Sequence, residues 1–303
     1  MTGSQVKRLV SLRPWIKLVR PQQWVKNFFV LAPLLFSGRA LDPSAQRAAL
    51  VAFVVFCLLA SAVYVINDVI DREQDRAHPT KRNRPIASGA IGVGSALVLA
   101  TILLVLSVSG AWSMGPKLFY CAVAYLSLNV VYSIWIKHVV ILDVFSISAF
   151  FVLRLLAGAA AVAVRPSVWL ILCGGLLSLY LGFAKRRHEL VLLGEGSSDH
   201  RAVLSQYSTA FLDQLSVVLL AVTIVSYIMY TLESDTARLV GGEALSYSTV
   251  FVLYGVLRYL FLVHKRLDGN PAETLLTDKG LLVAVTLWVA YCGAVIYQVR
   301  PLP

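Results

Sequence analysis

The chain has 303 residues, of which 58% are hydrophobic and only 14% are charged, and its mean hydropathy is +0.75. A soluble domain of this length could not cover so much apolar surface with so few charges, so the composition excludes a soluble globular protein. The net charge of +11 is explained by membrane topology and by attraction to anionic substrates or lipids. It does not indicate nucleic acid binding.

Long apolar runs predict the fold class. About nine runs reach the roughly 17 to 25 residues needed to cross a bilayer, which predicts an all-α polytopic membrane protein. We expect a single domain over residues 1–303, with residues 1–23 as a cytoplasmic N-terminal segment. The first run is short and Pro33 interrupts it, so its start is left open. The expected spans are Trp24–Ser37, Ala48–Ile66, Gly92–Trp112, Lys117–Ile136, Val139–Ala163, Ser167–Ala184, Phe211–Leu232, Leu245–Val263 and Gly280–Tyr297.

Basic residues are concentrated in alternate connections between these spans. The N-terminal tail through Lys26 and the segments after spans two, four, six and eight contain 19 of the 27 Lys and Arg residues. By the positive-inside rule, the N-terminus and the loop after span two face the cytoplasm. We therefore expect a multi-pass protein of a bacterial plasma membrane with a cytoplasmic active site. An odd number of spans would place the C-terminus outside.

Three oxygen-bearing side chains, Asn67, Asp71 and Asp75, recur at every fourth position where the second span meets a basic segment. On a helix this spacing stacks them along one face. Neighbouring acidic groups repel each other unless a cation lies between them, and Mg²⁺ prefers hard oxygen ligands together with substrate phosphates. The spacing therefore predicts a magnesium site for a diphosphate at the membrane surface. The alternative is a solvated helix end paired with nearby arginines, and which of Asp68, Asp71 and Asp75 would bind metal directly stays open.

Further cations lie on the same side or inside the membrane. A charge within a span is costly and normally faces a cavity or a partner, which singles out Arg154 in the fifth span. Together with the acidic motif, these groups predict a central polar cavity that faces the cytoplasm. The alternatives are topology signals, a structural pair for Arg154, and lysines that only reach to the membrane interface. The candidate substrate-binding cations are Lys26, Lys81, Arg84, Lys137 and Arg154.

The chain resembles the UbiA superfamily of intramembrane prenyltransferases. The matching features are the helix count, an Asn-Asp-x-x-Asp-x-x-x-Asp motif over Asn67–Asp75, and a Tyr-x-x-x-x-Lys element from Tyr132 to Lys137. The resemblance implies a helical bundle with a central cavity. It also implies that Asn67, Asp71 and Asp75 hold Mg²⁺ as the catalytic centre, and that a diphosphate is the leaving group.

Ordinary members of that superfamily carry a second Asp-rich motif at the end of span six, and this chain departs from them there. The corresponding segment, Lys185–Glu189, reads Lys-Arg-Arg-His-Glu. A cationic segment cannot hold a second Mg²⁺, but it can hold a phosphate. In this segment, in Arg20–Asn27 and in Asp71–Ala87, the chain resembles the decaprenyl-phosphate phosphoribosyltransferase branch.

That branch implies transfer of 5-phosphoribose from 5-phosphoribosyl 1-diphosphate to a polyprenyl (decaprenyl) phosphate, for cell-wall arabinogalactan precursors. Lys185 and Arg186 would orient the lipid phosphate, and Tyr64, three residues before Asn67, would reach the sugar or the diphosphate. The branch also suggests a homo-oligomer. Two alternatives stay open. One is UbiA-type prenyl transfer from a prenyl diphosphate to an aromatic or lipid acceptor. The other is a transporter or lipid-phosphate flippase, which explains Arg154 but not the fourfold spacing.

Overall fold

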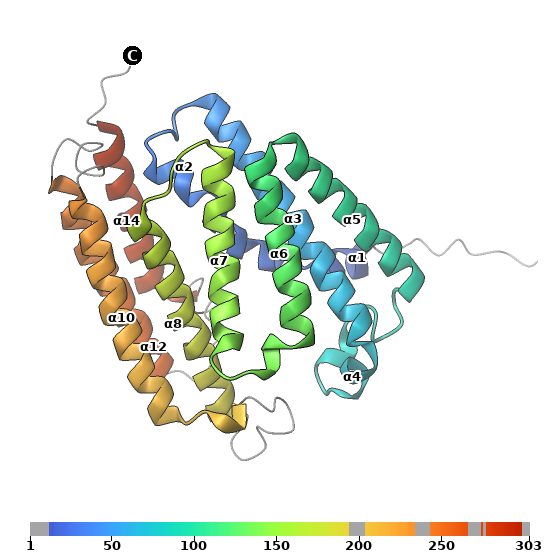
Figure 1. Ribbon diagram of the computed structural model, residues 1–303. Coiled ribbons are helices and arrows are strands. Elements are labelled where there is room, and N and C mark those ends of the chain that lie inside the picture. The colour runs from blue at the N-terminus through green and yellow to red at the C-terminus, as the bar shows by residue number, and fades with distance from the viewer. Residues whose placement is uncertain (1–11, 194–203, 234–242, 266–273, 275–276, 299–303) are drawn as a thin grey trace, which may run out of the picture.

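The computed structural model describes residues 12–193, 204–233, 243–265, 274 and 277–298. Within these ranges the chain is helical, without β-strands, and eight helices are long and apolar enough to cross a membrane (Figure 1). The predicted fold class, an all-α polytopic membrane protein, is confirmed. The eight helices are α3 (Pro43–Ile70), α5 (Val93–Ser113), α6 (Pro116–Ile134), α7 (Leu142–Ala161), α8 (Val168–Leu193), α10 (Thr209–Leu232), α12 (Thr249–Lys265) and α14 (Lys279–Gln298).

The N-terminal segment differs from the expectation of a span over Trp24–Ser37. Pro21 and Pro33 divide it, because proline lacks the N–H that a continuous α-helix needs. Arg20, ahead of the first break, has a left-handed conformation with φ of 53°. The described residues therefore contain eight candidate spans, against about nine expected. Two short helices, the 3₁₀-helix η1 (Pro21–Val30) and α2 (Ala32–Phe36), replace the expected first span, and α1 (Leu12–Val19) precedes them.

The 3₁₀-helix η1 packs into the bundle against α3 and α7. Its last residue, Val30, is fully buried in a core that includes Phe56 of α3 and Tyr125 of α6. Gly158 of α7 makes this approach possible, since a Cβ there would lie 2.0 Å from the carbonyl oxygen of Val30. The position of η1, and of the polar residues on it, therefore depends on the absence of a side chain at Gly158 of α7.

The C-terminal half of the chain forms a second packed part of the bundle. α8 lies along α10, and α12 lies along α14. Tyr180, Leu220, Tyr259 and Leu281 belong to the core between these helices. α7 contacts α6 on one side and α8 on the other, so it joins the two halves (Figure 1).

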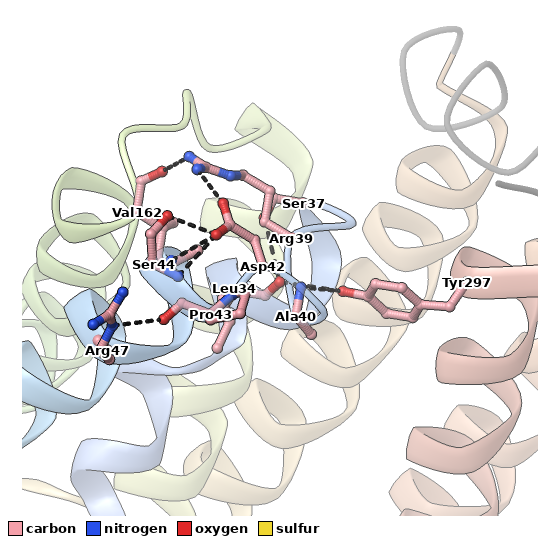
Figure 2. Close-up of polar contacts among 11 residues, drawn as sticks. Leu34, Ser37, Arg39, Ala40, Asp42, Pro43, Ser44, Arg47, Val162 and Tyr297 are labelled. Carbon is pink, nitrogen blue, oxygen red and sulfur yellow. Dashed lines mark hydrogen bonds and ion pairs between the residues drawn. The ribbon is translucent and has the colours of Figure 1, made fainter. Parts of the chain in front are cut away.

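A polar loop ties the chain together where α2 leads into α3 (Figure 2). Asp42 caps α3 by accepting a hydrogen bond from the amide of Ser44 at 2.8 Å, and it pairs with Arg39 at 2.6 Å. These bonds hold the pKa of the Asp42 carboxyl below its usual range. The hydroxyl of Tyr297 on α14 accepts from the amide of Ala40 at 2.9 Å. The loop therefore links the first long helix to the last.

The opposite end of the bundle carries the charged connections. In Figure 1, α4 and the α6–α7 connection lie at this end, as does the C-terminal end of α8, whereas α2 lies at the other end. The short helices between the spans are α4 (Arg72–Ala77), η2 (Lys81–Asn83), η3 (Ile136–His138), η5 (Leu204–Gln206) and η6 (Glu243–Ser248).

Candidate active site

The fourfold register of the acidic motif is present in the backbone. The amide of Asp71 bonds to the carbonyl oxygen of Asn67, and the amide of Asp75 to that of Asp71, each at 2.8 Å. These helical bonds continue from α3 into α4 although Asp71 itself caps the end of α3. Asn67, Asp71 and Asp75 therefore follow one another at intervals of one helical turn, as the sequence predicts.

Four oxygen-bearing side chains of the motif divide into two pairs with different surroundings. Asp68 and Asp75 are buried, and Arg84 lies between them, with its Nη1 3.1 Å from Asp68 Oδ1 and 2.7 Å from Asp75 Oδ2. Arg20 adds a contact to Asp68 at 2.5 Å. The side chains of Asn67 and Asp71 are half-buried and form no hydrogen bond or ion pair with any described residue.

The expected set of three metal ligands is therefore not assembled in the described part of the chain. The carboxylate of Asp75 pairs with Arg84, and no three His, Cys, Asp or Glu side chains of the described residues are grouped to hold a metal. Asn67 and Asp71 do fit a hard cation, since both offer accessible oxygen atoms that no described side chain engages. Arg84, a candidate for substrate binding, is placed as a partner of two carboxylates.

Arg154 lies in the interior and is held by neutral groups. It is 4% exposed, and its Nε donates to Asn27 Oδ1 of η1 at 2.6 Å. Its Nη2 donates to the hydroxyl of Tyr125 at 3.1 Å, and its Nη1 to the carbonyl oxygen of Phe150 at 2.9 Å. None of the described carboxylates pairs with it. An interior cation with no counter-charge is costly, so this site is suited to an anionic ligand.

Lys26 lies beside Arg154 and outside the eight candidate spans. Burial, together with the nearby charges of Arg154 and Arg20, lowers the pKa of Lys26 to about 8. Tyr64 completes this group, because the guanidinium of Arg20 stacks over its ring at 5.0 Å from the centroid. The structure thus brings Lys26, Tyr64 and Arg154 together with Arg20, close to the end of α3.

Lys81 and Lys137 lie on the connections at the same end of the bundle. Lys81 is exposed at the start of η2, and Lys137 is half-buried in η3. Neither forms an ion pair with a carboxylate among the residues that the structure describes. Tyr132, the other half of the Tyr-x-x-x-x-Lys element, packs edge-on against Phe150 of α7.

The basic segment at the end of α8 contains two different kinds of residue. Lys185 is 52% exposed and lies 4.0 Å from Glu189. Arg186 is 2% exposed, pairs with Asp143 of α7 at 3.1 Å, and also pairs with Glu189. Arg186 therefore lies inside the protein between two carboxylates, and it does not face outward as expected for a ligand of the lipid phosphate.

Several residues of the site were not singled out from the sequence. The sequence raised Asp68 only as a possible metal ligand and Arg20 and Asn27 only as parts of the segment Arg20–Asn27, so their roles as partners of Arg84, Asp68 and Arg154 were not predicted. Asp143 and Tyr125 lie within expected spans, where a polar residue is itself a signal of a partner. The rule that singles out Arg154 therefore also indicates Asp143 and Tyr125.

The UbiA prenyltransferase family matches residues 27–190, more than half of the chain and including the acidic motif and Lys137. The chain belongs to this family. The match ends at the C-terminal part of α8, directly after the basic segment that distinguishes this chain from ordinary members.

Relatives with curated names extend the likeness to the whole chain. A decaprenyl-phosphate phosphoribosyltransferase of Mycolicibacterium smegmatis is 34% identical over 98% of this chain and 96% of that protein. A protein of the same name from Mycobacterium tuberculosis H37Rv is 34% identical over 93% of each chain. A solved structure, a UbiA homolog from Archaeoglobus fulgidus bound to DMAPP and Mg²⁺, shares the fold with a TM-score of 0.70. That likeness covers 95% of this chain and 100% of the other, at 19% sequence identity.

Proposed function

We propose that this membrane protein transfers 5-phosphoribose from 5-phosphoribosyl 1-diphosphate to a polyprenyl phosphate, with Mg²⁺ as cofactor. The observation that carries the proposal is an excess of cations without counter-charge. Lys26, Lys81, Lys137 and Arg154 have no carboxylate partner among the described residues, whereas Asn67 and Asp71 remain available for a metal. A compact donor with several phosphates matches such a site, and the names of the relatives support the same reaction.

The donor would lie between the end of α3 and η1. Arg154 and Lys26 would face its phosphates, and Asn67 and Asp71 would hold the Mg²⁺. When bound, Mg²⁺ would supply positive charge that stabilises the departing diphosphate. Asn27 and Tyr125 fix the direction of the Arg154 guanidinium, so this charge is positioned before the donor arrives.

The reaction requires no strong general base. An oxygen of the lipid phosphate, already anionic, forms a bond to C1 of the ribose, and the bond between C1 and the diphosphate oxygen breaks. The diphosphate leaves with the electron pair, so charge increases on the leaving group and the cations around it lower the barrier. Attack opposite the leaving group would invert the α donor to a β product.

The acceptor phosphate would bind at the exposed end of α8. Lys185 is the accessible cation there, and Arg186, buried behind it, would support the segment. The polyprenyl tail would lie between helices or in the bilayer, and the site would open to the cytoplasm.

A donor-swap assay on purified protein with Mg²⁺ tests the proposal. One reaction contains radiolabelled phosphoribosyl diphosphate and decaprenyl phosphate, and the other contains a labelled prenyl diphosphate and an aromatic acceptor. We expect lipid-soluble label in the first reaction only. Product in the second reaction only would make the protein a prenyltransferase of the usual UbiA kind, and an α-configured phosphoribosyl product would exclude direct displacement.

A further inference from the structure

The connection between η3 and α7 contains a strained turn. Ile141 has φ of 70° and ψ of −48°, and the amide of Leu142 donates to the carbonyl oxygen of Val140 at 2.8 Å. These values describe a γ-turn with positive φ, which is rare and strained. A β-branched residue makes it less favourable still. Such a conformation persists only where surrounding contacts hold it in place.

Tyr207, between η5 and α10, supplies the contact at this turn. Its hydroxyl accepts a hydrogen bond from the amide of Ile141 at 2.6 Å and donates to Oδ1 of Asp143 at 3.2 Å. The ring packs edge-on against Phe183 of α8, and the residue is 5% exposed. One hydroxyl therefore bonds both to the strained residue and to the first turn of α7.

The contacts of Asp143 extend from the turn to the end of α8. Its second carboxylate oxygen lies 3.1 Å from Nε of Arg186, which also pairs with Glu189. Arg186 directly follows Lys185 on the same helix. On the other side, the amide of Asp143 bonds to the carbonyl oxygen of Val139 at 3.1 Å, immediately after η3 and Lys137. The contacts of Tyr207 thus connect the segment of Lys137 to the segment of Lys185.

We propose that Tyr207 is a positioning residue for the transfer reaction: its hydroxyl holds the Ile141 turn and so sets the placement of Lys137 relative to Lys185. The inference rests on the proposed function, in which Lys137 binds the donor and Lys185 the acceptor. Losing the hydroxyl would free the amide of Ile141, relax the turn and displace η3, while the ring would continue to fill its place in the core.

The test compares Tyr207→Phe with Tyr180→Phe. Tyr180 is a matched control, because it is fully buried on α8 and its hydroxyl has no hydrogen-bond partner among the described residues. We expect Tyr207→Phe to lower kcat/KM for the phosphoribosyl donor at least about tenfold, because it removes both hydrogen bonds of the buried hydroxyl. Hydrogen exchange of residues 139–143 should accelerate in the same variant. Tyr180→Phe should leave both quantities unchanged.

Glycine at position 141 separates a role in positioning from a role in packing. Glycine adopts positive φ at little cost, so Ile141→Gly combined with Tyr207→Phe should recover most of the lost kcat/KM. Tyr207→Phe alone could fail to accumulate as folded protein. In that case a folded and active Ile141→Gly/Tyr207→Phe double variant supports the inference, and a double variant that also fails to fold overturns it. A Tyr207→Phe protein with wild-type kcat/KM for the donor and wild-type exchange overturns it, as does a loss of activity that the glycine does not rescue.

The two proposals fail in distinguishable ways. If wild-type protein transfers no phosphoribose, the proposed reaction is wrong, whereas the exchange measurement still reports whether Tyr207 holds the turn. If wild-type protein is active and Tyr207→Phe matches it in every measurement, the reaction stands and the positioning role is wrong.

Discussion

The basic side chains of the site differ in whether they pair with a carboxylate. Arg20, Arg84 and Arg186 each pair with acids, whereas Lys26 and Arg154 have none among the described residues. Removing one member of a buried pair leaves a costly unpaired charge, but a cation that already lacks a partner gains one when an anion binds. This difference separates residues expected to affect folding from residues expected to affect substrate binding.

Asp71 and Asp68 provide a direct comparison at this scale. Asp71→Ala should reduce phosphoribosyl transfer roughly 100-fold or more while leaving the unfolding temperature unchanged, because its carboxylate has no described partner. Asp68→Ala should lower the unfolding temperature, because it leaves Arg20 and Arg84 short of a partner. Turnover with saturating Mg²⁺ and thermal unfolding in detergent measure the two effects. Wild-type turnover in Asp71→Ala would remove the metal assignment.

The lowered pKa of Lys26 predicts a pH dependence of donor binding. The protonated ammonium binds phosphate, so donor affinity should be full below pH 8 and fall as the pH rises through about 8. The KM for the donor, measured between about pH 7 and about pH 10, should therefore rise across this interval. Lys26→Arg should remove the rise, because arginine stays charged throughout. The same rise in Lys26→Arg as in wild type would assign it to another group.

At the scale of elements, the contact between η1 and α7 places Lys26 and Asn27. Gly158→Ala would put a Cβ 2.0 Å from the carbonyl oxygen of Val30 and push η1 away from α7. We expect a loss of about 1 to 3 kcal/mol in the free energy of unfolding, typical of overpacking, together with a raised KM for the donor.

Gly255 is the matched control for Gly158. It also lies within a long helix, but a Cβ there would meet nothing within 4 Å. Gly255→Ala should therefore be neutral or stabilising by up to about 1 kcal/mol, from helix propensity alone. Chemical unfolding and donor KM measured on both variants check the prediction. Equal behaviour of the two would mean that η1 does not depend on the missing side chain of Gly158.

At the scale of the whole molecule, the orientation in the membrane stays a prediction from the basic residues. Leu41 is exposed in the α2–α3 loop, at the N-terminal end of α3. Ala90 is exposed in the connection from α3 to α5, at the opposite end of these two helices. With the four native cysteines replaced by alanine, Leu41→Cys should react with a membrane-impermeant thiol reagent on intact cells. Ala90→Cys should react only after permeabilisation. The reverse pattern would place the site outside the cytoplasm.

The sequence by itself determined the class of fold and the family, and it predicts the end of the bundle at which the site is proposed. Apolar runs long enough to cross a bilayer can hardly be anything but helices there, because the backbone must satisfy its own hydrogen bonds. The spacing of Asn67, Asp71 and Asp75 could also be predicted from the sequence, because it is one helical turn and depends on no tertiary contact. Pro33 interrupts the expected first span in the sequence, and the structure has the two short helices η1 and α2 there.

Only the tertiary structure decided which charges face each other. Asp75 and Arg84 read as a metal ligand and a substrate ligand, and Arg186 as a ligand of the lipid phosphate, yet each is placed in an ion pair. Asp68 on α3 pairs with Arg84 beyond η2, and Asp143 on α7 pairs with Arg186 on α8, so the members of each pair lie on different elements. Pairing between helices depends on packing at specific points, such as Gly158 against Val30, and no periodicity along one helix encodes it.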